Sequence, residues 1–132
     1  MKYFLYLVAL LLTSFSLISS QQGFNLSQSM ERGKQVYSTH CFTCHMEKGE
    51  GIQGVYPPLA KSDYLMADKN RAIKQVLEGA NGEMIVNGEK YFGFMTGFPL
   101  SDTEVSDVLN YIRNSWGNKG APVTPAEVKA LR

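Results

Sequence analysis

The residues with the most distinctive chemistry are the cysteines and the histidine of the run Cys41-Phe42-Thr43-Cys44-His45. Two thiols three positions apart can each add to one vinyl group of a porphyrin, which forms two thioether bonds. The imidazole that follows directly can bind the iron as its proximal ligand. Cys41 and Cys44 are the only cysteines of the chain, and the motif occurs once. The run therefore predicts the covalent attachment of a single haem c.

Other uses of a Cys-x-x-Cys pair agree less well with the rest of the chain. A thioredoxin-like redox motif is expected beside a βαβ pattern, which this sequence lacks. A structural zinc site needs four ligands, and only His40 could join the three residues of the motif. A disulfide between Cys41 and Cys44 would close a very short loop and constrain little of the unfolded chain. Haem attachment remains the favoured interpretation.

The sixth coordination position of such an iron separates electron transfer from ligand chemistry. Beyond the first twenty residues, the methionines are Met30, Met46, Met66, Met84 and Met95. Met30 lies on an expected helix and Met46 adjoins His45, so neither is expected to reach the opposite haem face. Met95 lies in the segment 93–99, which is expected to be irregular, and backbone freedom there lets a thioether turn inward. Met84, Met66, His40 and an open site remain as alternatives.

Two helices are expected around the motif. The first runs from residue 30 or 31 to about residue 39, with Ser29 as its N-cap, and leads directly into the first cysteine. The second covers residues 71–78, with Asn70 as its N-cap and Gly79 at its end. Apolar residues recur on both at helical spacing, which indicates one buried face on each.

The second half of the chain adds a hairpin and further helices. Residues 84–91 are strand-forming residues around Asn87-Gly88, which is the strongest short hairpin signal. Residues 101–104 form a capping box, and the helix that they open is expected to stop at Gly117. Residues 124–127 begin a short terminal helix. These patterns predict an all-α domain with long loops and one small β-hairpin.

The first twenty residues resemble a signal peptide. Lys2 precedes an almost wholly apolar run, and small polar residues follow it. An uncleaved membrane anchor is the alternative, although the apolar run is shorter than a spanning helix prefers. The expected organisation is a signal peptide at 1–20, a mobile linker at 21–29, one domain at 30–118 and a tail with a short helix at 119–132.

The charge of the chain argues against nucleic-acid binding. The formal net charge is +1, and removal of Lys2 with the signal peptide leaves a neutral mature chain. No basic block interleaved with aromatic residues suggests contact with nucleic acid. A neutral total still allows a charged docking face, because steering depends on the distribution of charge.

The motifs together resemble those of bacterial class I monohaem c-type cytochromes, over residues 30–118. The matching motifs are Gly33-x-x-x-Tyr37-x-x-x-Cys41, Pro57-Pro58-Leu59, Val86-Asn87-Gly88, Tyr91-x-Gly93-x-Met95 and the aromatic Tyr111 of the last long helix. Thr96 is a departure, because many relatives have proline after the ligand methionine. The resemblance implies a class I cytochrome c-like domain wrapped around one haem, with Gly33 at a close helix crossing.

The resemblance also implies roles for individual residues. Pro57 would offer its carbonyl to the ring of His45, and Leu59 would pack on the haem. Met95 would be the second axial ligand. Tyr91 is a candidate hydrogen-bond partner of a haem propionate, although such aromatics more often belong to a core or a rim.

The implied function is electron transfer in the periplasm rather than catalysis. Redox partners of such proteins include quinol-oxidising complexes, dehydrogenases, and terminal oxidases or reductases. Contact with a membrane would come only through such partners or through an uncleaved signal anchor. A dedicated cytochrome subunit of a larger oxidoreductase is the alternative, and a haem enzyme or gas sensor with a labile methionine is a more distant one.

Overall fold

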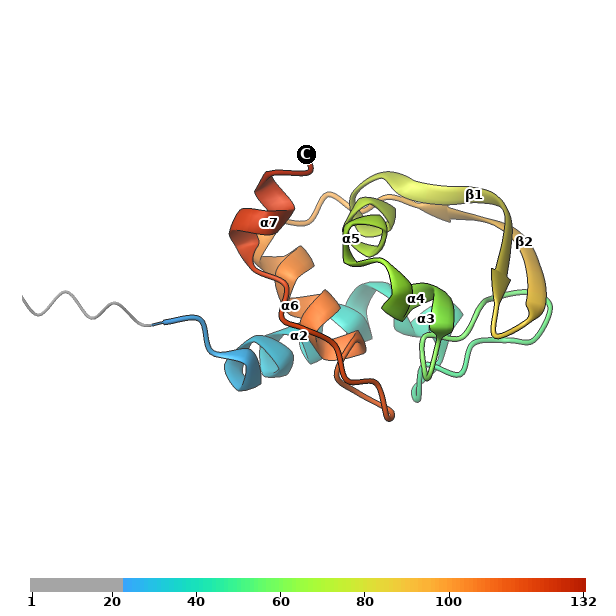
Figure 1. The fold of residues 1–132 in the computed structure, drawn as a ribbon, viewed down its shortest axis with the longest axis horizontal. Helices are drawn as coiled ribbons and strands as arrows, with labels where there is room; N and C mark the ends of the chain where they lie inside the picture. The colour runs from blue at the N-terminus through green and yellow to red at the C-terminus, as the bar shows by residue number, and fades with distance from the viewer. Residues whose placement is uncertain (1–22) are drawn as a thin grey trace, which may run out of the picture.

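The computed structural model describes residues 23–132, which form helices and one antiparallel hairpin (Figure 1). The helices are α2 (Leu26–His40), α3 (Phe42–His45), α4 (Asp63–Ala67), α5 (Lys69–Glu78), α6 (Asp102–Ile112) and α7 (Pro125–Lys129). The strands β1 (Gly79–Val86) and β2 (Glu89–Thr96) lie between α5 and α6 in the chain. The expected signal peptide, residues 1–20, lies outside the described residues. The expected mainly helical fold with one small hairpin is confirmed.

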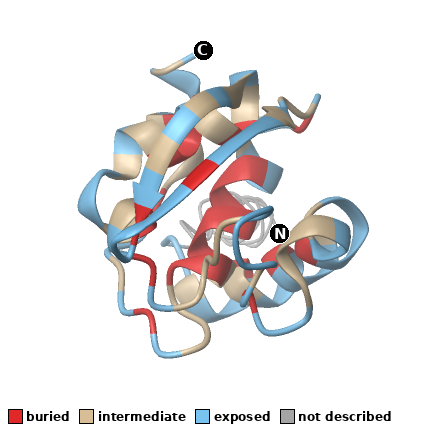
Figure 2. Ribbon diagram, turned by 90° about the vertical axis from the view of Figure 1, so that its right-hand side faces the viewer, coloured by how far each residue is buried: buried red, intermediate tan, exposed pale blue. Residues whose placement is uncertain are grey.

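Helix α6 forms the centre of the domain. Helices α2, α5 and α7 all pack against it, and Figure 2 shows the buried residues gathered on these central helices. The apolar face of α6 consists of Val105, Val108, Leu109 and Ile112, each at most 5% exposed. This face supplies four of the twelve buried side chains of the hydrophobic core, as its spacing predicts. Within residues 23–132, every helix falls short of the length and apolar character that crossing a bilayer requires.

Two expected N-caps are wrong. Helix α2 begins at Leu26, with the Asn25 side chain accepting from the backbone of Gln28, so Ser29 lies inside the helix. Residues 26–29, expected in the linker, thus belong to α2. Helix α5 is capped by Asp68 rather than by Asn70. In both places a neighbouring Asn or Asp accepts the free backbone N–H, and sequence pattern alone does not rank such neighbours.

The hairpin is longer than its sequence signal indicates. Asn87 and Gly88 form the turn, both with positive φ (51° and 81°), as a tight hairpin turn requires. The strands pair along their whole length, from Val86 opposite Glu89 to Gly79 opposite Thr96. Residues 93–96, which were expected to be irregular, are therefore part of β2. Helix α6 keeps its predicted capping box but ends at Ile112, before Gly117.

Candidate haem site

The Cys-x-x-Cys-His run forms the junction between two helices. Cys41 caps α2, and Cys44 and His45 occupy the last turn of α3. Both cysteines are free thiols and partly buried. Burial, with a smaller effect of the neighbouring Cys44, raises the pKa of Cys41 to about 11. One helical turn therefore presents two free thiols and an imidazole together.

The ring of His45 is oriented by a hydrogen bond to Pro57. Its Nδ1 lies 2.9 Å from the Pro57 carbonyl oxygen, and the ring N–H donates. Burial lowers the pKa of His45, and the Pro57 carbonyl acts in the opposite direction. An acceptor on one ring nitrogen fixes the tautomer and makes the other nitrogen a better metal ligand. His45 is thus prepared to bind a metal through Nε2.

The loop between α3 and α4 brings Pro57 to this position. Gly51 has a φ of +64°, and a Cβ there would lie 2.8 Å from the Pro57 carbonyl oxygen. Its backbone N–H donates to the His45 carbonyl at 3.1 Å. A glycine is required here because the backbone approaches the acceptor of the imidazole so closely. The sequence did not predict this role of Gly51, because it indicates only that the loop is rich in glycine.

A cavity of about 220 Å³ lies between α3, α5 and the hairpin. Folded proteins contain few voids larger than a water molecule, so a cavity of this size marks room for a bound group. Six of the seven expected site residues line it: Cys41, Cys44, His45, Pro57, Tyr91 and Met95. A smaller cavity of about 60 Å³ is lined by the seventh, Leu59, and again by Cys41, His45 and Met95. The structure therefore brings all seven residues together.

The hairpin forms one wall of the larger cavity. Cross-strand pairs share a face, so Met84–Tyr91, Gly82–Gly93 and Ala80–Met95 all belong to its inner side. A Cβ on Gly82 would meet no atom within 4 Å, and one on Gly93 only a backbone oxygen at 4.0 Å. The paired glycines leave the middle of this wall hollow, where a flat ring system can approach.

The positions of the methionines separate the candidates for a second ligand. Met84 and Met95 both line the larger cavity, whereas Met95 also lines the smaller, deeper one beside Leu109. Met66 packs against the hydrophobic core and lines neither of the two cavities. Met95 lies on a strand rather than in an irregular loop, so its inward orientation comes from strand alternation instead of backbone freedom.

The donor set and the shape of the cavity fit a covalently bound haem. The thiols of Cys41 and Cys44, the oriented imidazole of His45 and a methionine thioether all face one space. A site of this kind combines thioether attachment with two axial ligands of the types found on haem iron. Gln75 also lines both cavities; the sequence placed it on a helix but gave no sign that it faces the site.

The comparison with protein families decides the assignment. Residues 30–116 match the model of the family Cytochrome c. The chain belongs to the cytochrome c family. As a cytochrome c, it carries covalently bound haem c and transfers electrons.

Individual relatives of this cytochrome c are of two kinds. Cytochrome c-552 of Thermus thermophilus is 38% identical over 81% of this chain and 78% of the relative. The cytochrome c subunit of alcohol dehydrogenase (quinone) from Gluconobacter oxydans is 32% identical over 76% of this chain, but over only 22% of its own length. The gluconate 2-dehydrogenase cytochrome c subunit of Pantoea cypripedii is 31% identical, with 24% of its length covered. The chain thus matches about a quarter of each dehydrogenase subunit.

Proposed function

We propose that this cytochrome c is an exported electron carrier, not an enzyme, whose haem iron is bound by His45 and Met95. The observation that carries the proposal is the shared cavity, in which Cys41, Cys44 and His45 face a wall that contains Met95. Haem c, when bound, supplies a one-electron couple between Fe(III) and Fe(II). The protein's contribution is to fix the ligands and to exclude water around them.

The residues of the site favour the reduced state. A methionine thioether is a soft ligand that suits Fe(II) better than Fe(III). The apolar residues Leu59, Val108 and Leu109 line the deeper cavity beside Met95 and His45, which disfavours extra positive charge on the metal. Pro57 has the opposite effect on the iron, because its carbonyl makes the imidazole of His45 more basic and so favours Fe(III). We expect a positive reduction potential, as for other His/Met haems.

The rim of the cavity suits brief contacts with redox partners. Val55, Tyr56 and Phe94 line the cavity and are also exposed, with Phe94 at 74%. Redox partners form small interfaces that release quickly, and a few exposed apolar side chains around an opening are enough for such a contact. Donors and acceptors of the proposed kinds are a quinol-oxidising complex, a dehydrogenase, and a terminal oxidase or reductase.

A dedicated subunit of a larger oxidoreductase is the second candidate. It is supported by the similarity to the cytochrome c subunits of the two dehydrogenases. In either role the protein works in the periplasm, with residues 1–20 as its export signal. Affinity capture from the native periplasm and membrane separates the two roles: a stoichiometric partner indicates a subunit, and free cytochrome indicates a carrier.

Mass spectrometry tests the proposal directly. Co-expression with the haem maturation machinery should give a mass raised by one haem, a mature chain that begins near residue 21, and colour that survives acid–acetone extraction. Cys44→Ser should weaken or abolish attachment, whereas Thr43→Ser, inside the same motif, should leave it unchanged. Extractable haem in the wild type would overturn the covalent assignment to this motif.

A further inference from the structure

The residue directly after His45 has an unusual backbone conformation. Met46 has φ 62° and ψ 174°, a region that only glycine enters without strain. Its backbone N–H donates to the Phe42 carbonyl at 2.9 Å and closes helix α3. A bulky side chain remains in this region only when the surrounding structure holds it there.

Tyr37 of α2 supplies the strongest contact on this turn. Its hydroxyl donates to the Met46 carbonyl oxygen at 2.6 Å, and the backbone N–H of Gly49 donates to the same oxygen at 3.3 Å. The tyrosine is only 2% exposed. Burial raises its pKa, so the hydroxyl keeps the proton that it donates.

The ring of Tyr37 is fixed from two sides. Its centroid lies 5.4 Å from that of Tyr111 and 5.2 Å from that of Trp116. A tyrosine in this packing cannot turn its hydroxyl away without moving two other aromatic side chains. The hydrogen bond to Met46 is therefore made by a rigid donor rather than by a mobile one.

Two successive carbonyl groups connect this turn to the imidazole. The His45 carbonyl accepts from Gly51, and the Met46 carbonyl accepts from Tyr37. These contacts set the direction in which the loop leaves α3, and the same loop returns Pro57 to the Nδ1 of His45. A turn that relaxed at Met46 would carry Gly51 and Pro57 away from the ring.

We propose that Tyr37 is a positioning residue for the proximal ligand: its hydroxyl holds the strained turn at Met46 and so keeps the Pro57 carbonyl on the ring of His45. The inference rests on the proposed role of His45 as an iron ligand. It assigns the tyrosine hydroxyl a task separate from that of the ring, which packs between α2 and α6.

The test compares three single variants and one double variant of the haem-loaded protein. Tyr37→Phe keeps the packed ring and removes the hydroxyl, and Tyr111→Phe is the matched control from the same aromatic cluster. Met46→Gly, alone and with Tyr37→Phe, removes the strain that the hydroxyl restrains. The readouts are solvent exchange of the His45 Nδ1–H, followed by NMR in the reduced state, and the reduction potential.

In Tyr37→Phe we expect the ring N–H to exchange roughly three- to tenfold faster, the range that the loss of one hydrogen bond gives. The potential should rise, because a less basic imidazole stabilises Fe(III) less. Tyr111→Phe should change neither readout. In the Met46→Gly background, Tyr37→Phe should change exchange less than twofold, because glycine holds the turn unaided.

Unchanged exchange in Tyr37→Phe, or an equal change in Tyr111→Phe, overturns the inference. The inference is also overturned if Tyr37→Phe speeds exchange of the His45 ring N–H equally in the Met46→Gly protein and in the wild type. The hydroxyl would then act through packing and not by holding the turn at Met46. The wild-type protein tests the proposed function separately from this inference. If the wild-type His45 resonances lack the large shifts of an iron ligand, then the ligand assignment itself is wrong.

Discussion

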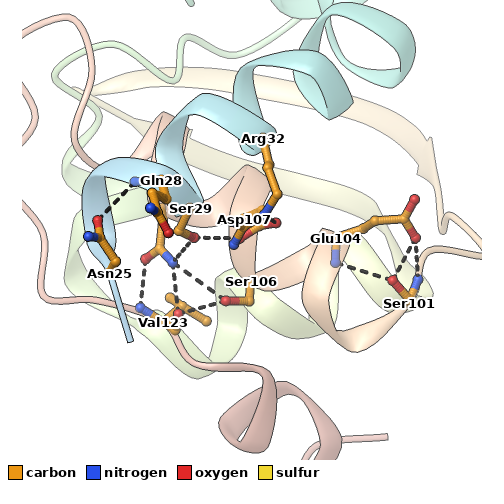
Figure 3. A network of polar contacts seen from close by, with 10 residues as sticks. Asn25, Gln28, Ser29, Arg32, Ser101, Glu104, Ser106, Asp107 and Val123 are labelled. Atoms are coloured by element: carbon orange, nitrogen blue, oxygen red, sulfur yellow. Dashed lines mark hydrogen bonds and ion pairs between the residues drawn. The ribbon is translucent and has the colours of Figure 1, made fainter. Parts of the chain in front are cut away.

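A Cβ placed on Gly33 of α2 would lie 1.9 Å from the carbonyl oxygen of Asp107 on α6. The helices cross at this point with their backbones almost in contact. The Asp107 carboxylate tightens the crossing, since it accepts from Ser29 at 2.5 Å and from Arg32 at 2.6 and 2.8 Å (Figure 3). Because α2 leads directly into its C-cap Cys41, this crossing sets the position of the haem-attachment motif relative to the core.

Gly33→Ala should destabilise the protein strongly. The added methyl group meets backbone atoms that cannot move aside, and overpacking of this kind costs about 1–3 kcal/mol or more. Chemical denaturation of the haem-loaded protein measures the free energy of unfolding. Gln35→Ala, exposed on the same helix, should stay within about 0.5 kcal/mol of the wild type. Equal stability of Gly33→Ala and the wild type would contradict the close crossing.

The Glu127 carboxylate should make the docking of α7 sensitive to acid. Its Oε1 lies 2.5 Å from the Lys69 ammonium group, and this hydrogen bond, more than any other contact, lowers the pKa of Glu127 below its usual value of 4.5. A depressed folded-state pKa gives stability that is fully present above about pH 4.5 and is lost as the pH falls through the lower folded value.

Unfolding measured from pH 7 to pH 3 checks this effect. The wild type should exceed Glu127→Gln in stability at neutral pH, and the difference should shrink as the solution becomes more acidic. Glu31→Gln, exposed on α2, makes the same change of charge away from Lys69 and serves as the control. A difference that is constant over this pH range would contradict a lowered pKa of Glu127 in the folded protein.

Local signals in the sequence predicted much of the fold. The turn at Asn87-Gly88, the capping box at residues 101–104 and the helix end at Gly79 all depend on backbone conformations that their own residue types favour. Ser29 shows the limit of such signals. A serine before an apolar helical run resembles a cap, but here it serves a carboxylate 78 positions away, which no local pattern reveals.

The residues of the site also divide into those that local sequence predicts and those that need the tertiary structure. Cys41, Cys44 and His45 lie within five consecutive residues, so their spacing alone predicted their chemistry. Gly93 was expected to begin an irregular segment, but it lies in β2 and pairs with Gly82 on β1. Gln75 faces the cavity because of how α5 packs on α6, and such an orientation needs the tertiary structure. Residues contributed by distant elements were therefore predicted from their local context or from the resemblance, or they were missed.

Gly51→Ala should disturb the proximal side of the haem. The new Cβ would lie 2.3 Å from the Tyr56 carbonyl oxygen and 2.8 Å from that of Pro57. The loop has to shift, which weakens the hydrogen bond to His45 and should raise the reduction potential. Redox titration measures this potential.

Gly54→Ala is the matched control for Gly51→Ala. Gly54 also has a positive φ, of +74°, but a Cβ there meets no atom within 4 Å. Its replacement should lower stability by about 1–2 kcal/mol through backbone strain alone and leave the potential unchanged. If both variants shift the potential equally, then general loosening of the loop, not the approach of Gly51 to Pro57, explains the effect.

Met95→Ala should abolish the weak far-red charge-transfer band that a methionine thioether gives on ferric haem. It should also open the iron to small added ligands. The potential should fall, because a soft ligand that favours Fe(II) has been removed. Absorption spectra of the oxidised protein and redox titration measure both effects.

Met84→Ala provides the control for Met95→Ala, because both methionines line the same wall of the cavity. Met84 pairs with Tyr91 on the hairpin, whereas Met95 also reaches the deeper cavity beside His45. The far-red band should therefore survive the loss of Met84. Loss of the band in Met84→Ala, together with its survival in Met95→Ala, would transfer the ligand role to Met84 and leave the attachment by Cys41 and Cys44 untouched.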